Sequence, residues 1–306
     1  MNTLTQSMLQ HAYAIAQEVD AKALMFDAEA WENPDDLNEA LAEVNYRLLL
    51  VSRSRPPGSQ DSEVIEPPEM NSDRVSVIHI PNVPLTRLAQ VKVSMLVGVA
   101  EKKLARGDVI VCLSGVQHSN RLDTMVVIRV GDEAEFFLTD ESYPLPPDVD
   151  PAVFERVLSI ASELAVEGRE TRTVGATFVV GDSENVLENS RQLVFNPFHG
   201  YPEEDCNILS GGLDETIKEF AAIDGAFIIR GDGVVLAAGR YLMGTGKSTE
   251  QLRGGLGARH ESAASITSVT DAVSITLSQS TSTITIFNSG RVMTEIEKIR
   301  VGGEGS

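Results

Sequence analysis

The sequence predicts an α/β protein of two domains, each a β-sheet flanked by helices. Three observations lead to this class. A chain of 306 residues is long enough for two cores of ordinary size. Apolar runs typical of helices and strands alternate along it. A segment with four prolines, residues 141–151, separates residues 1–140 from residues 152–300 and predicts an extended linker at the domain boundary.

Helices and strands are expected to alternate in the first domain. Apolar residues recur at helical spacing in residues 4–19 and 85–104, and Asn33-Pro34 predicts the start of a third helix that runs to residue 44. Residues 52–74 are polar and proline-rich, which predicts a long loop. Short apolar runs predict strands of a parallel or mixed sheet at residues 23–26, 47–51, 75–80, 109–113 and 125–130.

The second domain is expected to hold a mixed sheet built largely from hairpins. It opens with an amphipathic helix at residues 152–167, and further helices are expected at residues 213–221 and 262–267. Turn sequences at residues 231–233 and 288–290 favour hairpins. Strands are predicted at residues 176–180, 227–230, 234–237, 273–277 and 283–287.

The composition excludes several classes of protein. Net charge is −20, with seven lysines among 25 basic residues, so the surface disfavours nucleic acid and anionic membranes. Apolar runs are far shorter than the ~20 residues that span a bilayer, and residues 1–10 show no secretory signal. Cys112 and Cys206 lie in apolar surroundings, which is typical of reduced thiols. We therefore expect a cytoplasmic protein that binds neither membranes nor nucleic acid.

Two glycine turns carry the chemistry. Asp224-Gly225-Ala226 precedes a strand, and residues 257–263, with the sequence GARHESA, precede a small-residue helix. A helix N-terminus beside Arg259 and His260 favours a phosphate, because free N–H groups and the helix dipole attract anions. Metal-assisted phosphoryl or nucleotidyl transfer requires a carboxylate that faces this phosphate-binding position.

These two turns resemble the D-G-A and G-x-R-H-x-x-A signatures of the diadenylate cyclase family, and the resemblance extends over residues 153–293. It implies that two ATP molecules are condensed into cyclic di-AMP and two pyrophosphates, with Mn²⁺ or Mg²⁺ as cofactor. It also implies a homo-oligomer in which two cyclase domains meet face to face, so that each 3′-hydroxyl attacks the other nucleotide's α-phosphate.

The resemblance implies a role for each matching residue. Asp224, Arg259 and His260 are expected to be catalytic, and Asp224 and His260 are the expected metal ligands. Leu242 matches a position that packs on adenine. The full set expected to bind ATP is Asp224, Gly225, Ala226, Leu242, Gly257, Ala258, Arg259, His260, Ser262 and Ser278.

Three positions depart from the family pattern and leave a second interpretation open. Ala258 and Glu261 stand where a threonine and a second arginine are frequent, and Gln279 replaces a frequent glutamate. Because Gln is a poor metal ligand beside carboxylates, the domain could instead be a degenerate cyclase that senses ATP or cyclic di-AMP. A conventional ATPase is disfavoured, because Tyr241 stands where the phosphate loop ending in residues 246–248 needs a glycine.

Residues 92–115 resemble the C-terminal domain of pyruvate kinase, an α/β layer. This resemblance implies a first domain that organises oligomers or regulates the second domain, with an effector pocket as the alternative. Together the two resemblances identify the chain as similar to the soluble archaeal type of diadenylate cyclase, which joins such a domain to the cyclase domain.

Overall fold

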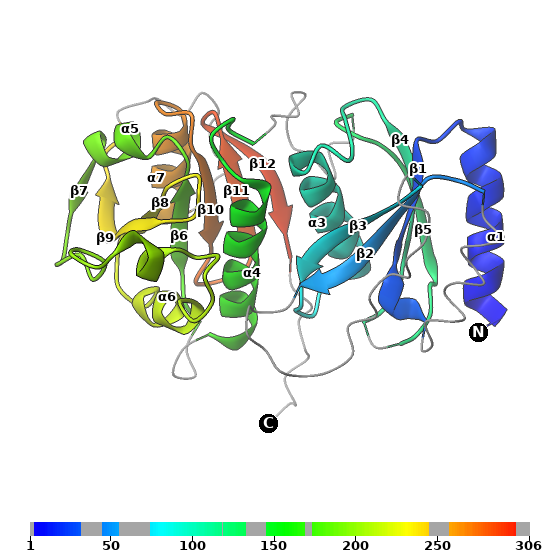
Figure 1. Ribbon diagram of the computed structural model, residues 1–306, viewed down its shortest axis with the longest axis horizontal. Coiled ribbons are helices and arrows are strands. Elements are labelled where there is room, and N and C mark those ends of the chain that lie inside the picture. Colours follow the sequence, from blue (N-terminus) through cyan, green and yellow to red (C-terminus); the bar gives the residue numbers. More distant parts are fainter. Residues whose placement is uncertain are drawn as a thin grey trace.

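The computed structural model describes residues 3–31, 45–54, 74–117, 119–132, 145–168, 173–244 and 257–297. The helix predicted at residues 33–44 and most of the loop predicted at residues 52–74 lie outside these ranges. The described chain forms two β-sheets with helices around them (Figure 1), as the α/β class predicts.

The first sheet has the strand order β3-β2-β1-β4-β5. Its first four strands are parallel and β5 is antiparallel to β4, which confirms the expected parallel or mixed sheet. The strands are β1 (Ala23–Asp27), β2 (Leu48–Ser54), β3 (Val75–Pro81), β4 (Val109–Ser114) and β5 (Thr124–Arg129).

Helices cover both faces of this sheet. Helix α1 (Thr3–Glu18) packs with Leu24, Phe26 and Leu50 on one face. Helix α3 (Arg87–Ala100) packs on the other, and the Thr86 side chain caps its N-terminus by accepting from Ala89 N–H. A short 3₁₀ turn, η1 (Ala28–Ala30), follows β1.

The second sheet has the order β12-β11-β10-β6-β8-β9-β7. Strands β6 and β8 pair in parallel and the other pairs are antiparallel, which confirms a mixed sheet rich in hairpins. The strands are β6 (Ala176–Val180), β7 (Ser190–Gln192), β8 (Ala226–Ile229), β9 (Val235–Leu242), β10 (Val273–Leu277), β11 (Ile284–Asn288) and β12 (Arg291–Ile296).

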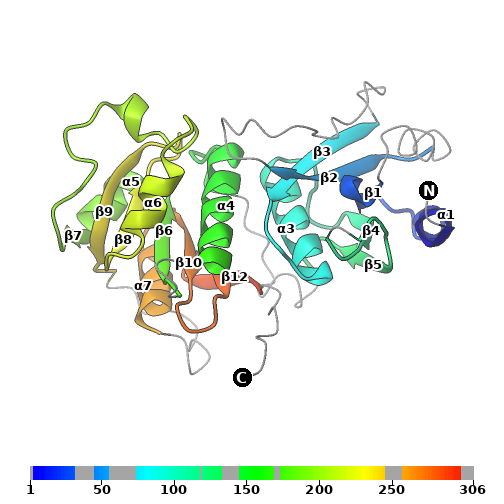
Figure 2. The same ribbon diagram turned by 90° about the horizontal axis from the view of Figure 1, so that it is seen from below.

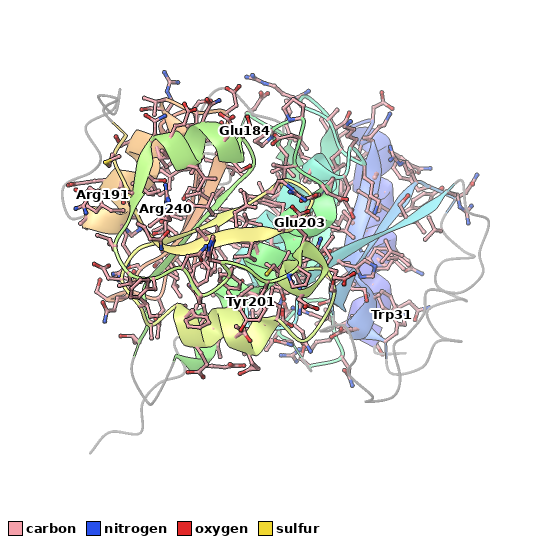
Figure 3. All side chains as sticks on the ribbon, turned by 60° about the vertical axis from the view of Figure 1, so that its left-hand side comes forward. Trp31, Glu184, Arg191, Tyr201, Glu203 and Arg240 are labelled. Carbon is pink, nitrogen blue, oxygen red and sulfur yellow. The ribbon has the colours of Figure 1, made fainter. Side chains whose placement is uncertain are left out.

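Alternating side chains of β6 define the two faces of this sheet. Phe178 packs toward α4 (Pro151–Glu167) and α6 (Asp214–Phe220), whereas Val179 packs toward α5 (Ser183–Glu188) and α7 (Ala258–Thr267). A 3₁₀ turn, η2 (Glu203–Cys206), lies in the connection from β7 to α6. Figure 3 shows Tyr201 and Glu203 on this connection and Arg191 and Arg240 at the β7–β9 edge.

One apolar core joins the two halves of the molecule. It includes Met95 of α3, Leu158 of α4 and core residues of both sheets. Both views place α3 and α4 in the middle of the molecule (Figures 1 and 2). Close packing of these helices stabilises one relative position of the two halves. None of the described helices is long and apolar enough to cross a membrane.

The described part of the predicted linker, residues 145–150, packs against the second sheet. Val149 is 6% exposed, and the Asp148 carboxylate accepts from Asp182 N–H at 2.9 Å. Asp150 then caps α4 through Ala152 N–H, and Pro151 follows in the first turn. This end of the segment is therefore part of the second domain and not a free spacer.

Two helices and three strands differ from expectation; one of the strands is β9, which was expected at residues 234–237 and extends to Leu242. Helix α7 begins at Ala258 and not at residue 262, because Gly257 acts as its N-cap without a side-chain hydrogen bond. The short α5 and β7 and the last strand β12 were not predicted. Each is stabilised by pairing or packing with distant segments, which local propensity does not register.

Candidate active site

The Asp224 turn is held in place by close backbone approach. Gly225 has φ +112°, and a Cβ there would lie 2.5 Å from the Gly239 carbonyl carbon. Only glycine fits this contact, which presses the turn onto β9. The Asp224 side chain is left 85% exposed at the start of β8.

The first turn of α7 supplies the cation and the imidazole. Arg259 and His260 lie inside the helix, directly after the N-cap Gly257. The Arg259 guanidinium crosses toward β8, where its Nη2 lies 3.5 Å from Asp224 Oδ1. It passes over Gly175 at the start of β6, where a Cβ would lie 3.0 Å from Arg259 Nη1. The fold thus brings together the Asp224 carboxylate and the Arg259 guanidinium, which are 35 positions apart in sequence.

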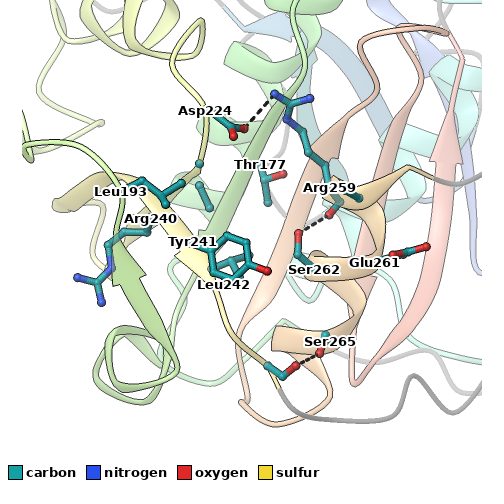
Figure 4. A pocket seen from close by; sticks show the side chains of 14 residues that line it. Thr177, Leu193, Asp224, Arg240, Tyr241, Leu242, Arg259, Glu261, Ser262 and Ser265 are labelled. Atoms are coloured by element: carbon teal, nitrogen blue, oxygen red, sulfur yellow. Dashed lines mark hydrogen bonds and ion pairs between the residues drawn. The ribbon is translucent and has the colours of Figure 1, made fainter.

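A cavity of about 660 Å³ opens between β8, β9 and α7 (Figure 4). Seven of the residues expected to bind ATP border it: Asp224, Gly225, Ala226, Leu242, Ala258, Arg259 and Ser262. Residues outside the expected ATP-binding set complete the lining: Thr177, Leu193, Arg240, Tyr241, Gly244, Glu261 and Ser265.

A second cavity of about 680 Å³ shares Asp224, Ala258 and Arg259 with the first. The expected residues Gly257, His260 and Ser278 border it. Hydroxyl side chains dominate the rest of its wall, and Leu277, Gln279, Glu295 and Glu297 complete it. All ten residues expected to bind ATP therefore lie on two adjoining cavities that meet at Asp224 and Arg259.

Arg240 of β9 fixes the edge strand β7. Its Nη2 donates to the carbonyls of Leu187 and Ser190, and its Nε donates to Ser190 Oγ. The side chain points away from the first cavity (Figure 4). On the same edge the Arg191 guanidinium carbon lies 4.9 Å from the Tyr241 ring centroid, a distance typical of a cation–π contact. These contacts hold Tyr241 and Leu242 beside the cavity.

Burial keeps His260 neutral. The residue is 5% exposed, and its ring meets Phe287 edge-on with the centroids 6.0 Å apart. Desolvation lowers the pKa of His260 below its usual value of 6.5, and the Arg259 charge lowers it further. The imidazole therefore carries a free lone pair at neutral pH.

Acidification is expected to destabilise the fold partly through His260. The unfolded chain takes up a proton at a pKa of 6.5, whereas folded His260 resists protonation, so its contribution is present above pH 6.5 and is lost as the pH falls. His79 shifts in the same direction. The melting temperature in EDTA should therefore fall between about pH 7.5 and 5, and it should fall less in His260→Asn. An equal fall in both proteins would contradict the role of His260.

The sequence contains signals for some of the cavity residues that lie outside the expected ATP-binding set. Thr177 lies two positions after Gly175, so strand alternation places it on the same face. Tyr241 adjoins Leu242, but both border the cavity because β9 ends there. Glu261 stands in the motif directly after His260, whereas Leu193 carries no signal, because its approach depends on tertiary packing.

Two families match different parts of the chain. Residues 4–138 match a family described as a probable sensor domain, DacZ_P, and residues 163–292 match the family described as DisA bacterial checkpoint controller nucleotide-binding.

Two known proteins with similar sequences are both diadenylate cyclases. A diadenylate cyclase of Methanocaldococcus jannaschii is 27% identical over 304 residues, which are 96% of this chain and 97% of that protein. A diadenylate cyclase of Haloferax volcanii is 34% identical over 193 residues, which are 62% of this chain and 68% of that protein.

Similarity to solved structures is weak. Staphylococcus aureus DacA is 22% identical with a TM-score of 0.30, covering 46% of this chain and 84% of its own. A Cryptosporidium parvum pyruvate kinase is 12% identical with a TM-score of 0.30, and the match covers 42% of this chain and 23% of the kinase chain. Scores this low define no fold relationship, so the pyruvate-kinase resemblance of the first domain stays a prediction.

The nucleotide-binding match covers both glycine turns, and the Haloferax protein exceeds 30% identity over more than two thirds of its length. On these grounds the chain belongs to the diadenylate cyclase family.

Proposed function

We propose that the two adjoining cavities bind ATP for the synthesis of cyclic di-AMP. Membership of the family makes the chain a nucleotidyltransferase that forms cyclic di-AMP from ATP. In each half of the reaction a ribose O3′ bonds to the other nucleotide's α-phosphorus. The bond from that phosphorus to the bridging oxygen breaks, and pyrophosphate leaves. The observation that carries the proposal is the meeting of Asp224 and Arg259 where the cavities join.

The chemistry of the walls orients ATP. Leu242 and Ala226 offer the first cavity an apolar surface on which adenine packs. The triphosphate crosses the N-terminus of α7, where backbone N–H groups and Arg259 favour anions, toward the hydroxyls of the second cavity, including that of Ser278. Arg259 neutralises charge that grows on the phosphates, and the Asp224 carboxylate accepts the proton of O3′.

The residues present fit Mn²⁺ or Mg²⁺ when ATP shares the coordination. Among the described residues no group of three or more His, Cys, Asp and Glu side chains could hold a metal. Mg²⁺, however, binds through one or two carboxylates together with substrate phosphates and water. The exposed Asp224 carboxylate meets this need, and neutral His260 offers a nitrogen. When bound, the ion would neutralise phosphate charge and favour ionisation of the 3′-hydroxyl.

Reaction requires two nucleotides, and we propose that a second copy of the chain presents the other one face to face. Leu193 borders the first cavity and is 38% exposed, and the adjoining Val194 and Phe195 are 42% and 101% exposed. Exposed apolar side chains beside a site are typical of an interface. A homo-oligomer that joins two such sites places the reacting atoms in line.

We propose two domains, residues 1–140 and 152–300, joined by the segment 141–151, whose described end packs on the second domain. The first domain regulates the enzyme or assembles its oligomer. The match to a probable sensor domain over residues 4–138 supports this division. We also propose a cytoplasmic enzyme that acts on ATP without nucleic acid or membrane. The free, buried Cys112 and Cys206 support a reducing compartment.

The second candidate is a degenerate domain that binds ATP or cyclic di-AMP as a sensor. Glu261 borders the first cavity and Gln279 borders the second, which favours this alternative. Incubation with ATP and Mn²⁺ or Mg²⁺, at low and high salt, decides between them by chromatography of the products. Cyclic di-AMP and pyrophosphate establish synthesis. Intact ATP in every condition, together with tight nucleotide binding, establishes the sensor.

The space at Gly257 tests whether phosphate occupies the N-terminus of α7. A Cβ at Gly257 would meet no described atom within 4 Å, and its φ of −77° suits any residue. Gly257→Ala should therefore fold normally. If a phosphate approaches the N-cap, the added methyl group takes its space, and calorimetry should show nucleotide affinity falling about tenfold. Wild-type affinity in the variant would place the phosphate elsewhere.

A further inference from the structure

Thr177 carries a hydroxyl with no hydrogen-bond partner in the described structure. The residue is 3% exposed and borders the first cavity, and its buried Oγ1 has no partner among the described residues. Other buried hydroxyls of this half are paired: Thr267 Oγ1 donates to Ala263 O, and Ser190 Oγ donates to Val186 O. An unpaired buried hydroxyl costs free energy, so a partner that enters with a ligand is the physical remedy.

The position of Thr177 on β6 determines what part of a nucleotide it can reach. On the same face, Gly175 lies under the Arg259 guanidinium, and Val179 packs in one apolar cluster with Leu242. Thr177 lies between these two positions on the strand. Figure 4 shows it with Asp224 and Arg259 on one side and Leu242 on the other.

The strand partner of Thr177 on β8 indicates more closely which part of a nucleotide its hydroxyl can reach. Thr177 pairs in register with Ala226, which follows the Asp224-Gly225 turn. The hydroxyl therefore lies close to the turn that presents Asp224, the proposed general base. In a nucleotide with its phosphates at Arg259 and its base on Leu242, the ribose occupies the space between.

We propose that Thr177 Oγ1 binds the ribose 2′-hydroxyl of ATP and so holds the neighbouring 3′-hydroxyl toward Asp224. This inference rests on the proposed function, which supplies the placement of the adenine and the phosphates. A threonine hydroxyl both donates and accepts, as the 2′-hydroxyl does, so the two groups satisfy each other. The contact makes Thr177 a positioning residue that selects ribonucleotides. A buried polar group that must pair with a substrate hydroxyl rejects the analogue lacking it.

The test compares ATP with 2′-deoxy-ATP in Thr177→Val and Thr177→Ser. Valine keeps the shape and removes the hydroxyl, whereas serine retains it. We expect the wild type to prefer ATP by about tenfold or more in kcat/KM. Thr177→Val should lose about that factor with ATP and nothing with 2′-deoxy-ATP, and Thr177→Ser should keep the preference.

Thr276→Val is the matched control, because Thr276 faces Thr177 in register from β10, is fully buried and does not border the cavity. It should leave the preference unchanged. Equal losses with both nucleotides in Thr177→Val would overturn the proposal and indicate contact with the base or a packing role. A wild type without preference would overturn it too.

Binding of α,β-methylene-ATP and its 2′-deoxy form, measured by calorimetry, separates this inference from the proposed function. Neither analogue can release pyrophosphate, so binding reports the contact whether or not the protein makes cyclic di-AMP. A 2′-hydroxyl preference that disappears in Thr177→Val supports the contact even if no product forms. Equal binding of both analogues by the wild type overturns the contact even if product forms.

Discussion

Replacing Asp224 by Asn is expected to reduce cyclic di-AMP synthesis by about a thousandfold. The substitution keeps the size of the side chain and removes the charge that, in the proposed mechanism, accepts the O3′ proton and holds the metal. General base catalysis alone supplies a factor of about 10²–10⁴. The carboxylate borders both cavities and is 85% exposed. Its loss therefore removes chemistry without opening the core. Initial rates of product formation at saturating ATP and Mn²⁺ measure the effect.

The chain contains a matched control for this substitution. Asp232 precedes Gly233 in another Asp-Gly turn, at the opposite end of β8, where it accepts hydrogen bonds from Arg230. Asp232→Asn should retain most of the activity, and both variants should keep the wild-type melting temperature within a few degrees. If Asp224→Asn keeps more than about a tenth of the wild-type rate, Asp224 is not the base.

Much of the fold could be predicted from local patterns. The buried strand β6 was expected at the residues where it occurs, because a short apolar run bounded by glycines allows few alternatives. Helix α7 was expected four residues late, because Gly257 gives no capping side chain and so no signal for its N-terminus. Strand β12 was missed because its pairing with β11 stabilises it more than its composition does.

The site could be predicted in content but not in geometry. Asp224 and Arg259 were recognisable by motif, and their approach to 3.5 Å depends on β6 lying between β8 and β10. No local pattern encodes that strand order. The unpaired hydroxyl of Thr177 is likewise a property of packing, because the same residue elsewhere in a strand would bind water or backbone.

The second large effect is expected at Phe195, whose side chain is fully exposed two positions after Leu193, which borders the first cavity. Leaving a phenylalanine in water is unfavourable, and aromatic side chains at the centre of an interface commonly contribute 2 kcal/mol or more. If Phe195 docks on a second copy, Phe195→Ala should weaken the face-to-face contact by about thirtyfold or more. The rate per chain should then rise steeply with enzyme concentration over a range where the wild-type rate is constant.

Leu88→Ala is the control, because Leu88 is a 47% exposed apolar residue on α3, in the other half of the molecule. It should change neither the rate nor its dependence on concentration. The nucleotide affinity of Phe195→Ala at low concentration should equal that of the wild type, since in the proposed mechanism each chain binds one ATP by itself. This result would separate failure to pair from failure to bind. Wild-type activity in Phe195→Ala at every dilution would place the interface on another surface, and the exposed ring would then need a different partner to explain it.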